Sequence, residues 1–439
     1  MASSEQVVGD TIPGSVASGY EAVQAVFRGF FDRKWDVGSG VAVYVGGEPI
    51  VRLTGGSRVV ASGDAPAYDA STIQLVASTT KFVESVCVML LVDRGLVRYG
   101  DRIVDHWPEF ANGNPGKERV TIRQLMMHRA GLPVFERKLG DDELFDLGAR
   151  ARFLERQPQV DALFQAERGD WRTQTPAPPQ AYHAVSRGLY SSELVRRVDA
   201  QHRRLGAFFR GEIAEPLGID FWIGLPDELA PRVSGTHMDP TVIMRLMSGD
   251  TASLTASTDP RHQLTDYEIS FLLNLLRDPD SLQSRALNCL APSGVAPTEL
   301  ANHPKLRACE LASSSGFGSA DALARIAAVA MSGTLGGTRI FSSDASLRQA
   351  TGTAHTYATD SMMLTRVEFT QGGFASFLAD DSHGTVSIGW GGAGGQLVRF
   401  VPELDLAIAY VTNTLGSRMA MNDPRGLELL DVAIRCARR

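Results

Sequence analysis

The sequence predicts an α/β (α+β) fold in which an antiparallel sheet, flanked by helices, carries an inserted and mainly helical domain. Two observations predict it. Runs with the composition of strands lie near both ends of the chain, and helix-like segments fill the middle. A sheet assembled from both ends explains this order. We therefore expect a discontinuous sheet domain over residues 1–120 and 312–439, and a mainly helical domain over residues 121–311.

Composition narrows the class of protein. The length of 439 residues suggests two or three domains, or one large α/β core with an inserted domain. Contents of 44% hydrophobic and 21% charged residues are ordinary values for a globular protein. A net charge of −7 and scattered arginines argue against a nucleic-acid surface. No run of about 18 apolar residues predicts a membrane span, and residues 1–19 lack the features of a secretory signal. We expect a cytoplasmic protein with no nucleic-acid or membrane partner; the oligomeric state is not predicted.

The N-terminal part predicts one helix and one hairpin. Apolar residues recur at helical spacing over residues 20–35, which indicates an amphipathic helix. Two strand-like runs, residues 41–45 and 50–53, flank Gly46-Gly47, which predicts a β-hairpin.

The middle of the chain reads as helices with irregular breaks. Helices are predicted over residues 121–128, 186–198, 205–217 and 320–331, and residues 173–180 form a Pro-rich loop. Residues 239–311 have the least regular pattern, and we expect them to shape a cap over an acyl pocket. Met238, Met244 and Met247 would line that pocket or belong to the core.

The last third predicts most of the sheet. Strand-like runs cover residues 361–369, 374–379, 386–390, 397–401 and 406–412, and a final helix covers residues 426–438.

The stretch Ser78-Thr79-Thr80-Lys81 carries the strongest chemical signal. It begins an apolar helical run, so Ser78 and Lys81 would share one helix face, with the amine within reach of the hydroxyl. A serine becomes a good nucleophile when a base takes its proton, and a lysine can be that base if burial lowers its pKa. One such pair is weak evidence, but two further motifs follow it in the order expected.

The second motif centres on Tyr182, which lies between the Pro-rich loop and a predicted helix. A phenol there could face Ser78 and Lys81 and transfer a proton to the leaving group. The alternative is an ordinary loop tyrosine, and without the first motif that alternative would be preferred. For the neighbouring His183 we favour a structural role over a catalytic one.

The third motif is glycine-rich, Gly389-Trp390-Gly391-Gly392-Ala393-Gly394-Gly395, and we place it between two strands. It fits Gly-x-Gly-x-x-Gly, but no helix follows, so a dinucleotide site is rejected. A glycine-rich strand edge lets backbone approach a substrate closely. The N–H groups of Ala393 and Ser78 would then bind an oxyanion. A plain glycine-rich turn is the alternative.

Other site chemistries have little support. The four cysteines lie far apart without metal-ligand spacing, and Cys87 is expected to be a small buried apolar residue. The histidines are isolated, and there is no Gly-x-Ser-x-Gly, His-Glu-x-x-His or Walker motif. We expect neither a metal nor a cofactor.

These three motifs together resemble the serine β-lactamase and penicillin-binding-protein superfamily. The nearest branch is that of the class C β-lactamase-related esterases (family VIII carboxylesterases) and related acyltransferases. Residues 125–133, 209–218 and 391–395 support the resemblance, which runs from about Tyr20 to the C-terminus. It implies a β-lactamase/transpeptidase-like fold. It also implies that Ser78 is the acylated nucleophile, Lys81 its base partner and Tyr182 the second proton-transfer residue.

The sequence departs from the antibiotic-hydrolysing members at two places. Their Tyr-x-Asn reads Tyr182-His183-Ala184 here, and their Lys-Thr-Gly reads Trp390-Gly391-Gly392. Without the amide and the lysine charge, recognition of an anionic lactam is weakened, whereas a tryptophan offers an apolar wall to an uncharged acyl group. The resemblance thus implies a serine hydrolase acting on a small-molecule ester or acyl donor. Acyl transfer to an alcohol, weak β-lactamase activity and a non-catalytic binding role stay open as alternatives.

Overall fold

The computed structural model describes residues 12–160, 180–295, 302–352, 358–378, 384–419 and 421–439. The Pro-rich loop predicted over residues 173–180 lies, apart from Gln180, outside the described residues.

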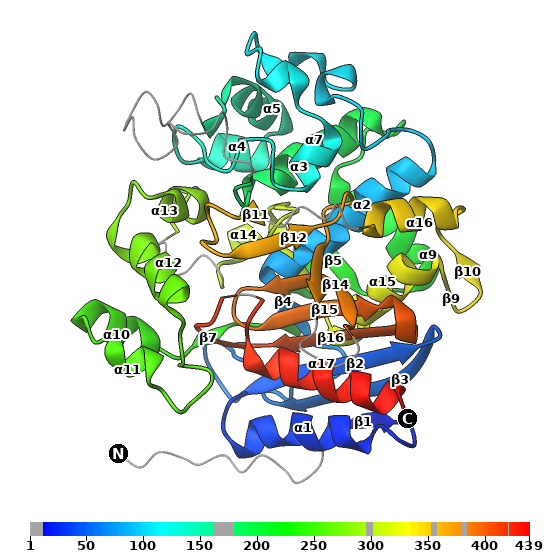
Figure 1. Ribbon diagram of the computed structural model, residues 1–439, viewed down its shortest axis with the longest axis vertical. Coiled ribbons are helices and arrows are strands. Elements are labelled where there is room, and N and C mark those ends of the chain that lie inside the picture. The colour runs from blue at the N-terminus through cyan, green and yellow to red at the C-terminus, as the bar shows by residue number, and fades with distance from the viewer. Residues whose placement is uncertain (1–11, 161–179, 296–301, 353–357, 379–383, 420) are drawn as a thin grey trace.

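A nine-stranded antiparallel sheet forms the centre of the molecule (Figure 1). In spatial order its strands are β1 (Gly14–Val16), β3 (Glu48–Gly56), β2 (Gly38–Val45), β16 (Leu406–Thr412), β15 (Gln396–Val401), β14 (Val386–Gly392), β13 (Ala375–Leu378), β12 (Arg366–Phe369) and β11 (Ala358–Thr359). The pair β16–β2 joins the two ends of the chain, with Ile408 opposite Val43. The predicted antiparallel sheet built from both ends is confirmed.

Helices cover both faces of this sheet (Figure 1). On one face α1 (Glu21–Asp32) and α17 (Pro424–Ala437) pack through Phe27, Phe30 and Leu429 onto Val43 and Ile408. On the other face the main core contains α2 (Thr80–Asp93) and α15 (Ala320–Ser332). Successive side chains of a strand point to opposite faces, and β2 is buried on both, so it reads as one apolar run.

The remaining helices lie above and beside the sheet (Figure 1). They are α3 (Ile122–Met126), α4 (Asp141–Phe145), α5 (Leu147–Arg156), α7 (Ser186–Val198), α8 (Leu205–Phe209), α9 (Glu215–Leu217), α10 (Thr241–Ser248), α11 (Ala252–Thr255), α12 (Asp266–Arg277), α13 (Leu282–Leu287), α14 (Pro304–Ala308) and α16 (Asp344–Thr351). A small second sheet orders β5 (Phe221–Ile223), β8 (Gly316–Gly318), β4 (Ile73–Leu75) and β6 (Val233–Ser234). Two short pairs of two-residue strands complete the described sheets: β9 (Thr334–Leu335) with β10 (Thr338–Arg339), and β7 (His237–Met238) with β17 (Thr414–Leu415). The boundaries proposed at residues 120/121 and 311/312 stay predictions.

Most predicted elements are found, although their ends shift by a few residues, and two of them differ further from the prediction. The strand expected over residues 361–369 is confirmed only from Arg366, because residues 361–364 form a turn whose N–H groups at Met362 and Met363 donate to Asp360. The helix expected over residues 205–217 is interrupted by a π-helical turn, Arg210–Ala214.

The segment expected to cap an acyl pocket is helical, and its methionines do not belong to the core. Met238, Met244 and Met247 are 51%, 59% and 58% exposed. The opposite side of α10, with Val242 and Leu246, packs in a small separate cluster. Cys87, by contrast, is fully buried as expected.

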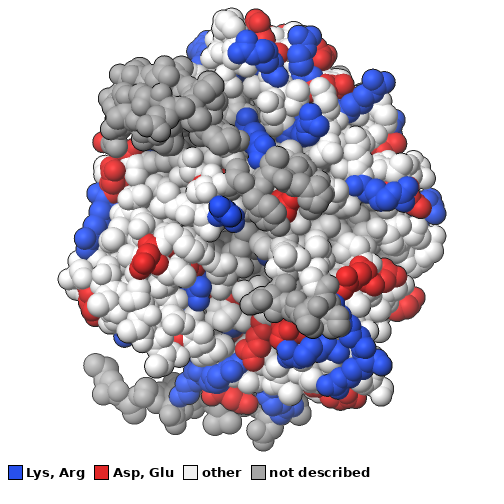
Figure 2. All heavy atoms as spheres, viewed as in Figure 1, with Lys and Arg blue, Asp and Glu red and all other residues white. Residues whose placement is uncertain are grey.

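The described surface carries charges of both signs. On the face seen in Figure 2, basic side chains at the upper and lower ends have acidic neighbours. No helix among the described residues has the length and apolar character needed to cross a membrane.

Candidate active site

Ser78 lies in a short turn between the small sheet and the buried helix α2. Strand β4 ends at Leu75, a 3₁₀ turn covers Ala77–Thr79, and α2 begins at Thr80 rather than at Ser78 as expected. Ala77 has a φ of +46°, in the left-handed region that residues with a Cβ rarely adopt. Such strain is kept where the surrounding structure fixes it, and it often accompanies functional positions. Here it presents Ser78 at the start of a rigid helix.

Tyr182 contacts the proposed nucleophile directly. Its Oη donates a hydrogen bond of 3.0 Å to Oγ of Ser78. Burial raises the pKa of Tyr182 to about 12, although the bond to Ser78 and the Arg187 cation each lower it. The phenol therefore carries its proton at neutral pH and can pass it on only in concert with a neighbouring base.

Lys81 is completely buried beside Tyr182. Its Nζ lies 4.8 Å from the centre of the Tyr182 ring and donates to the carbonyl oxygens of Ala184 (2.5 Å) and Ser313 (2.9 Å). The sequence predicted an amine within reach of the Ser78 hydroxyl; the hydrogen bonds that Nζ donates in the described structure go to these two carbonyls. Burial above all, and then the cation of Arg187, lower the pKa of Lys81 well below 10.5, whereas Glu84 opposes this shift. The environment thus favours the neutral amine, which is the form that can accept a proton.

A buried ion pair lies next to Lys81 and was not predicted. Arg187 and Glu84 are both fully buried, and Nε of Arg187 donates to Oε1 of Glu84 over 3.0 Å. Arg187 also donates to the carbonyl oxygen of Lys81 (2.9 Å), which joins α7 to the first turn of α2. The sequence offered one signal for this pair, the charged Glu84 within the apolar run that follows Lys81, and none for Arg187, because its helix contains several other polar and charged residues.

The backbone of Tyr182 is held by a second residue that the sequence reasoning missed. Oδ1 of the fully buried Asp360 accepts the Tyr182 N–H over 3.0 Å, and Gln180 donates to the same carboxyl group. A side chain far along the sequence thus fixes the loop that carries the phenol. No local pattern marks Asp360, because it precedes a run that reads as a strand.

His183 has both ring nitrogens occupied by backbone groups. Its Nε2 accepts the N–H of Leu132 over 3.0 Å, and its Nδ1 faces the carbonyl oxygen of Ala181 at 2.6 Å. Burial lowers the pKa of His183 to about 3, so the ring is neutral. These contacts fit the structural role favoured from the sequence.

The glycine-rich motif lies next to Ser78, although not simply between two strands. Gly389 to Gly392 belong to β14, and only residues 393–395 form the turn into β15. A Cβ on Gly392 would lie 2.4 Å from the carbonyl oxygen of Val76, so this edge packs tightly against the segment that leads to Ser78. Within the described chain, the backbone N–H groups of Ser78 and Ala393 donate to no acceptor. Both are available to an oxyanion.

Trp390 lies beneath this edge rather than in an open cleft. The indole is fully buried and stacks on Phe369 with ring centres 5.4 Å apart. The centre of the Tyr182 ring is 6.2 Å away. The indole of Trp390 therefore packs near the ring of Tyr182. In the described ranges, no three His, Cys, Asp or Glu side chains are placed to hold a metal ion.

Comparison with known proteins agrees with this geometry. The chain is 28% identical over 422 residues to esterase/beta-lactamase LipL of Mycobacterium tuberculosis, which covers 95% of this chain and 86% of LipL. Among solved structures, a family VIII carboxylesterase matches with a TM-score of 0.75 and 25% identity, covering 97% of this chain and all of that one. A penicillin-binding-protein homologue from Caulobacter crescentus matches with a TM-score of 0.72, the same identity and the same coverage.

The sequence profile of the beta-lactamase family matches residues 23–431, a span that holds Ser78, Lys81, Tyr182 and the glycine-rich edge. The chain belongs to the beta-lactamase family, within a superfamily that includes family VIII carboxylesterases.

Proposed function

We propose that this chain is a serine carboxylesterase that hydrolyses uncharged esters of short to medium acyl chains through an acyl-enzyme on Ser78. The observation that carries the proposal is the 3.0 Å hydrogen bond from Tyr182 to Ser78, beside a buried lysine whose pKa is lowered. Relatives described as esterases support the reaction class.

The geometry suggests how the groups divide the work. Oγ of Ser78 attacks the ester carbonyl carbon, and its proton moves through Tyr182 towards Lys81. The N–H groups of Ser78 and Ala393 bind the oxyanion. When the C–O bond breaks, the alcohol leaves with a proton returned through Tyr182. Water then attacks the acyl-serine ester, the same groups take its proton, and the acid is released.

Hydrolysis of β-lactams is the second candidate, because the relative LipL is described as an esterase/beta-lactamase. In this chain a buried indole, Trp390, occupies the place where the lactam-hydrolysing members carry a cationic lysine. We therefore expect a β-lactam to be a much poorer substrate than an ester.

The test compares the purified protein with Ser78→Ala on p-nitrophenyl acetate, p-nitrophenyl butyrate and a chromogenic cephalosporin. We expect ester hydrolysis that the substitution abolishes, with cephalosporin turnover at least about 100-fold slower in kcat/KM, a ratio typical when a polar recognition group is missing. Cephalosporin turnover equal to that of the esters would favour the second candidate. Adding a competing alcohol and measuring the new ester separates hydrolysis from acyl transfer.

A further inference from the structure

The turn that follows the glycine-rich edge is held from behind by a buried guanidinium. Arg425, from the first turn of α17, donates through Nη2 to the carbonyl oxygen of Gly394 over 2.8 Å. The same carbonyl accepts the N–H of Gly416 over 3.0 Å. The turn itself is closed by the Gly395 N–H, which donates to Gly392 over 3.1 Å. The carbonyl of Gly394 and the N–H of Gly395 are therefore both held, and Ala393 lies directly before them.

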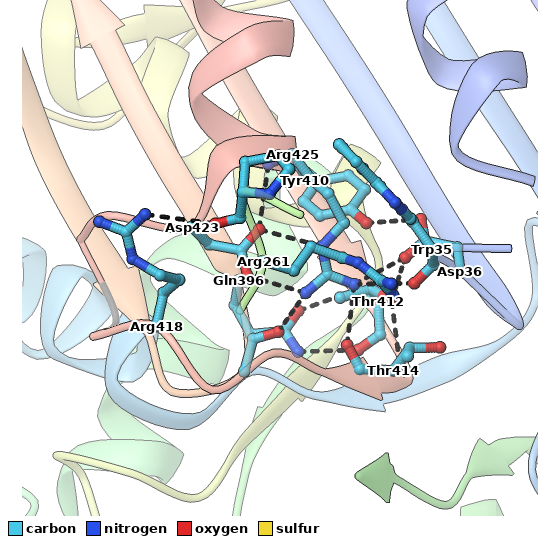
Figure 3. A network of polar contacts seen from close by, with 12 residues as sticks. Trp35, Asp36, Arg261, Gln396, Tyr410, Thr412, Thr414, Arg418, Asp423 and Arg425 are labelled. Carbon is cyan, nitrogen blue, oxygen red and sulfur yellow. Dashed lines mark hydrogen bonds and ion pairs between the residues drawn. The ribbon is translucent and has the colours of Figure 1, made fainter. Parts of the chain in front are cut away.

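The guanidinium is itself held in one orientation. Asp423 accepts from Nε and Nη2 over 2.9 Å each, and Asp36 accepts from Nη1 over 2.8 Å (Figure 3). Nη1 also donates to the carbonyl oxygen of Thr414 over 2.9 Å. All three charged side chains are at most 3% exposed. A planar guanidinium that is bound by acceptors on several sides keeps one orientation. It can therefore hold a contacting carbonyl in place more firmly than a flexible ammonium group can.

The backbone of the turn is shaped to this guanidinium. Gly395 has a φ of +108°, and a Cβ there would lie 2.5 Å from Nη2 of Arg425. A side chain at this position would displace either the turn or the arginine. Because Gly395 has no side chain, its backbone can lie close to Arg425. In the same way, Gly392 lies close to the segment that precedes Ser78.

We propose that Arg425 is a positioning residue for catalysis: through the Gly394 carbonyl it holds the turn that aims the Ala393 N–H at the oxyanion. This inference rests on the proposed function, because it assigns a support to the oxyanion site of that reaction. An oxyanion donor displaced by a fraction of an ångström loses much of its effect on the transition state and little of its effect on substrate binding.

The chain offers a matched control. Arg399, on β15, is as deeply buried as Arg425, but its Nη1 donates to the carbonyl oxygen of Val398, and its guanidinium lies 3.7 Å from the centre of the Phe377 ring. Arg399→Lys therefore makes the same chemical change at another buried arginine, one that lies opposite Gly389 of β14 and whose side chain donates no hydrogen bond to residues 392–395 in the described structure.

The experiment measures Arg425→Lys, Arg399→Lys and the wild type in three ways. For p-nitrophenyl butyrate hydrolysis by Arg425→Lys, we expect kcat to fall about 10- to 100-fold with KM within about threefold, since a misplaced oxyanion donor acts on the transition state. Affinity for an alkyl boronic acid, which forms a tetrahedral adduct with a serine, should fall by the same factor as kcat/KM. Hydrogen exchange of the peptide spanning residues 391–396 should become faster. Arg399→Lys should leave all three unchanged.

The outcomes separate positioning from mere stability. Unchanged kcat and boronate affinity in folded Arg425→Lys, or an equal loss in Arg399→Lys, would overturn the inference. If Arg425→Lys does not fold, Asp423→Asn, which replaces one of the two oxygens that accept from the guanidinium with an amide NH2 group, is judged by the same criteria. A wild type without ester hydrolysis would reject the proposed function instead. In that case the exchange measurement alone decides whether Arg425 holds the turn.

Discussion

The hydroxyl of Tyr182 donates to Oγ of Ser78 although 104 residues separate them in the chain. The contact joins the turn before α2 to the loop before α7. Val76, next to that turn, in turn meets Gly392 of β14. The turn before α2, the loop before α7 and strand β14 therefore meet near the Ser78 hydroxyl. Each of these segments leads to a separate prediction.

Removing the phenol hydroxyl should slow the chemistry without weakening substrate binding. In Tyr182→Phe the ring can still pack against Trp390, but the route from Ser78 to Lys81 loses its middle oxygen. We expect kcat for p-nitrophenyl butyrate to fall about 100- to 1000-fold, in the range for loss of a general acid–base group, with KM changed by less than about threefold. Steady-state kinetics measure both. A Tyr182→Phe variant with at least half the wild-type kcat would exclude the phenol from proton transfer.

The pH profile should report a base with a strongly lowered pKa. Lys81 is active when neutral, and because its pKa lies well below 10.5, the rate should rise with pH and level off well below pH 10.5. The measurement is kcat/KM as a function of pH for wild type and Lys81→Ala. We expect Lys81→Ala to lose at least about 100-fold in kcat. A profile that still rises at pH 10, or a Lys81→Ala variant with wild-type kinetics, would contradict this role.

A side chain at Gly392 should push the glycine-rich edge away from the nucleophile. The first added carbon would lie 2.4 Å from the carbonyl oxygen of Val76, far inside van der Waals contact. We expect Gly392→Ala to lower kcat about 10- to 100-fold, comparable to the weakening of one oxyanion donor. Gly100→Ala is the control, because a Cβ there meets nothing within 4 Å. Equal activities of the two variants would show that the edge does not take part.

The neutral buried His183 should make stability depend on pH. Its pKa is about 3 in the folded protein and about 6.5 when unfolded, so between these values the unfolded state binds one more proton. Stability therefore rises with pH in this window and is lost as pH falls, by about 1.4 kcal/mol per unit for one histidine. Urea unfolding at pH 7 and pH 5 tests this. In His183→Gln, the free energy of unfolding should change less with pH, by about 1.4 kcal/mol per pH unit. The same pH dependence in the variant and the wild type would contradict this role of His183.

Local patterns predicted the elements of this chain well. The helix Ser186–Val198 has the bounds that its apolar spacing indicated, and the hairpin of β2 and β3 turns at the Gly46-Gly47 pair. These features depend on residues near each other in sequence, where spacing and glycine conformation act directly. The resemblance of three short motifs to one family placed Ser78, Lys81 and Tyr182 in one site, and the structure brings these residues together.

What the sequence did not predict depends on contacts between distant segments. Asp360 supports Tyr182 from 178 residues away, and a lone aspartate before a strand carries no local signal of that contact. Helix spacing predicted only that the Lys81 amine would lie within reach of the Ser78 hydroxyl. Nζ of Lys81 donates to backbone carbonyls, and these acceptors cannot be predicted from sequence because every residue type has a carbonyl group. The methionines of the α10 region were expected in a pocket or a core, but pattern alone could not tell which helix face remains uncovered.

The central claim is that Ser78 forms a covalent acyl-enzyme, and active-site labelling tests it most directly. The protein is treated with a fluorophosphonate, digested and analysed by mass spectrometry, beside Ser78→Ala and with ester hydrolysis followed in parallel. We predict a single adduct on the peptide that contains Ser78, loss of ester hydrolysis in proportion to labelling, and neither adduct nor activity in Ser78→Ala. Hydrolysis that persists in Ser78→Ala, or an adduct on a different residue that accompanies inactivation, would contradict the account.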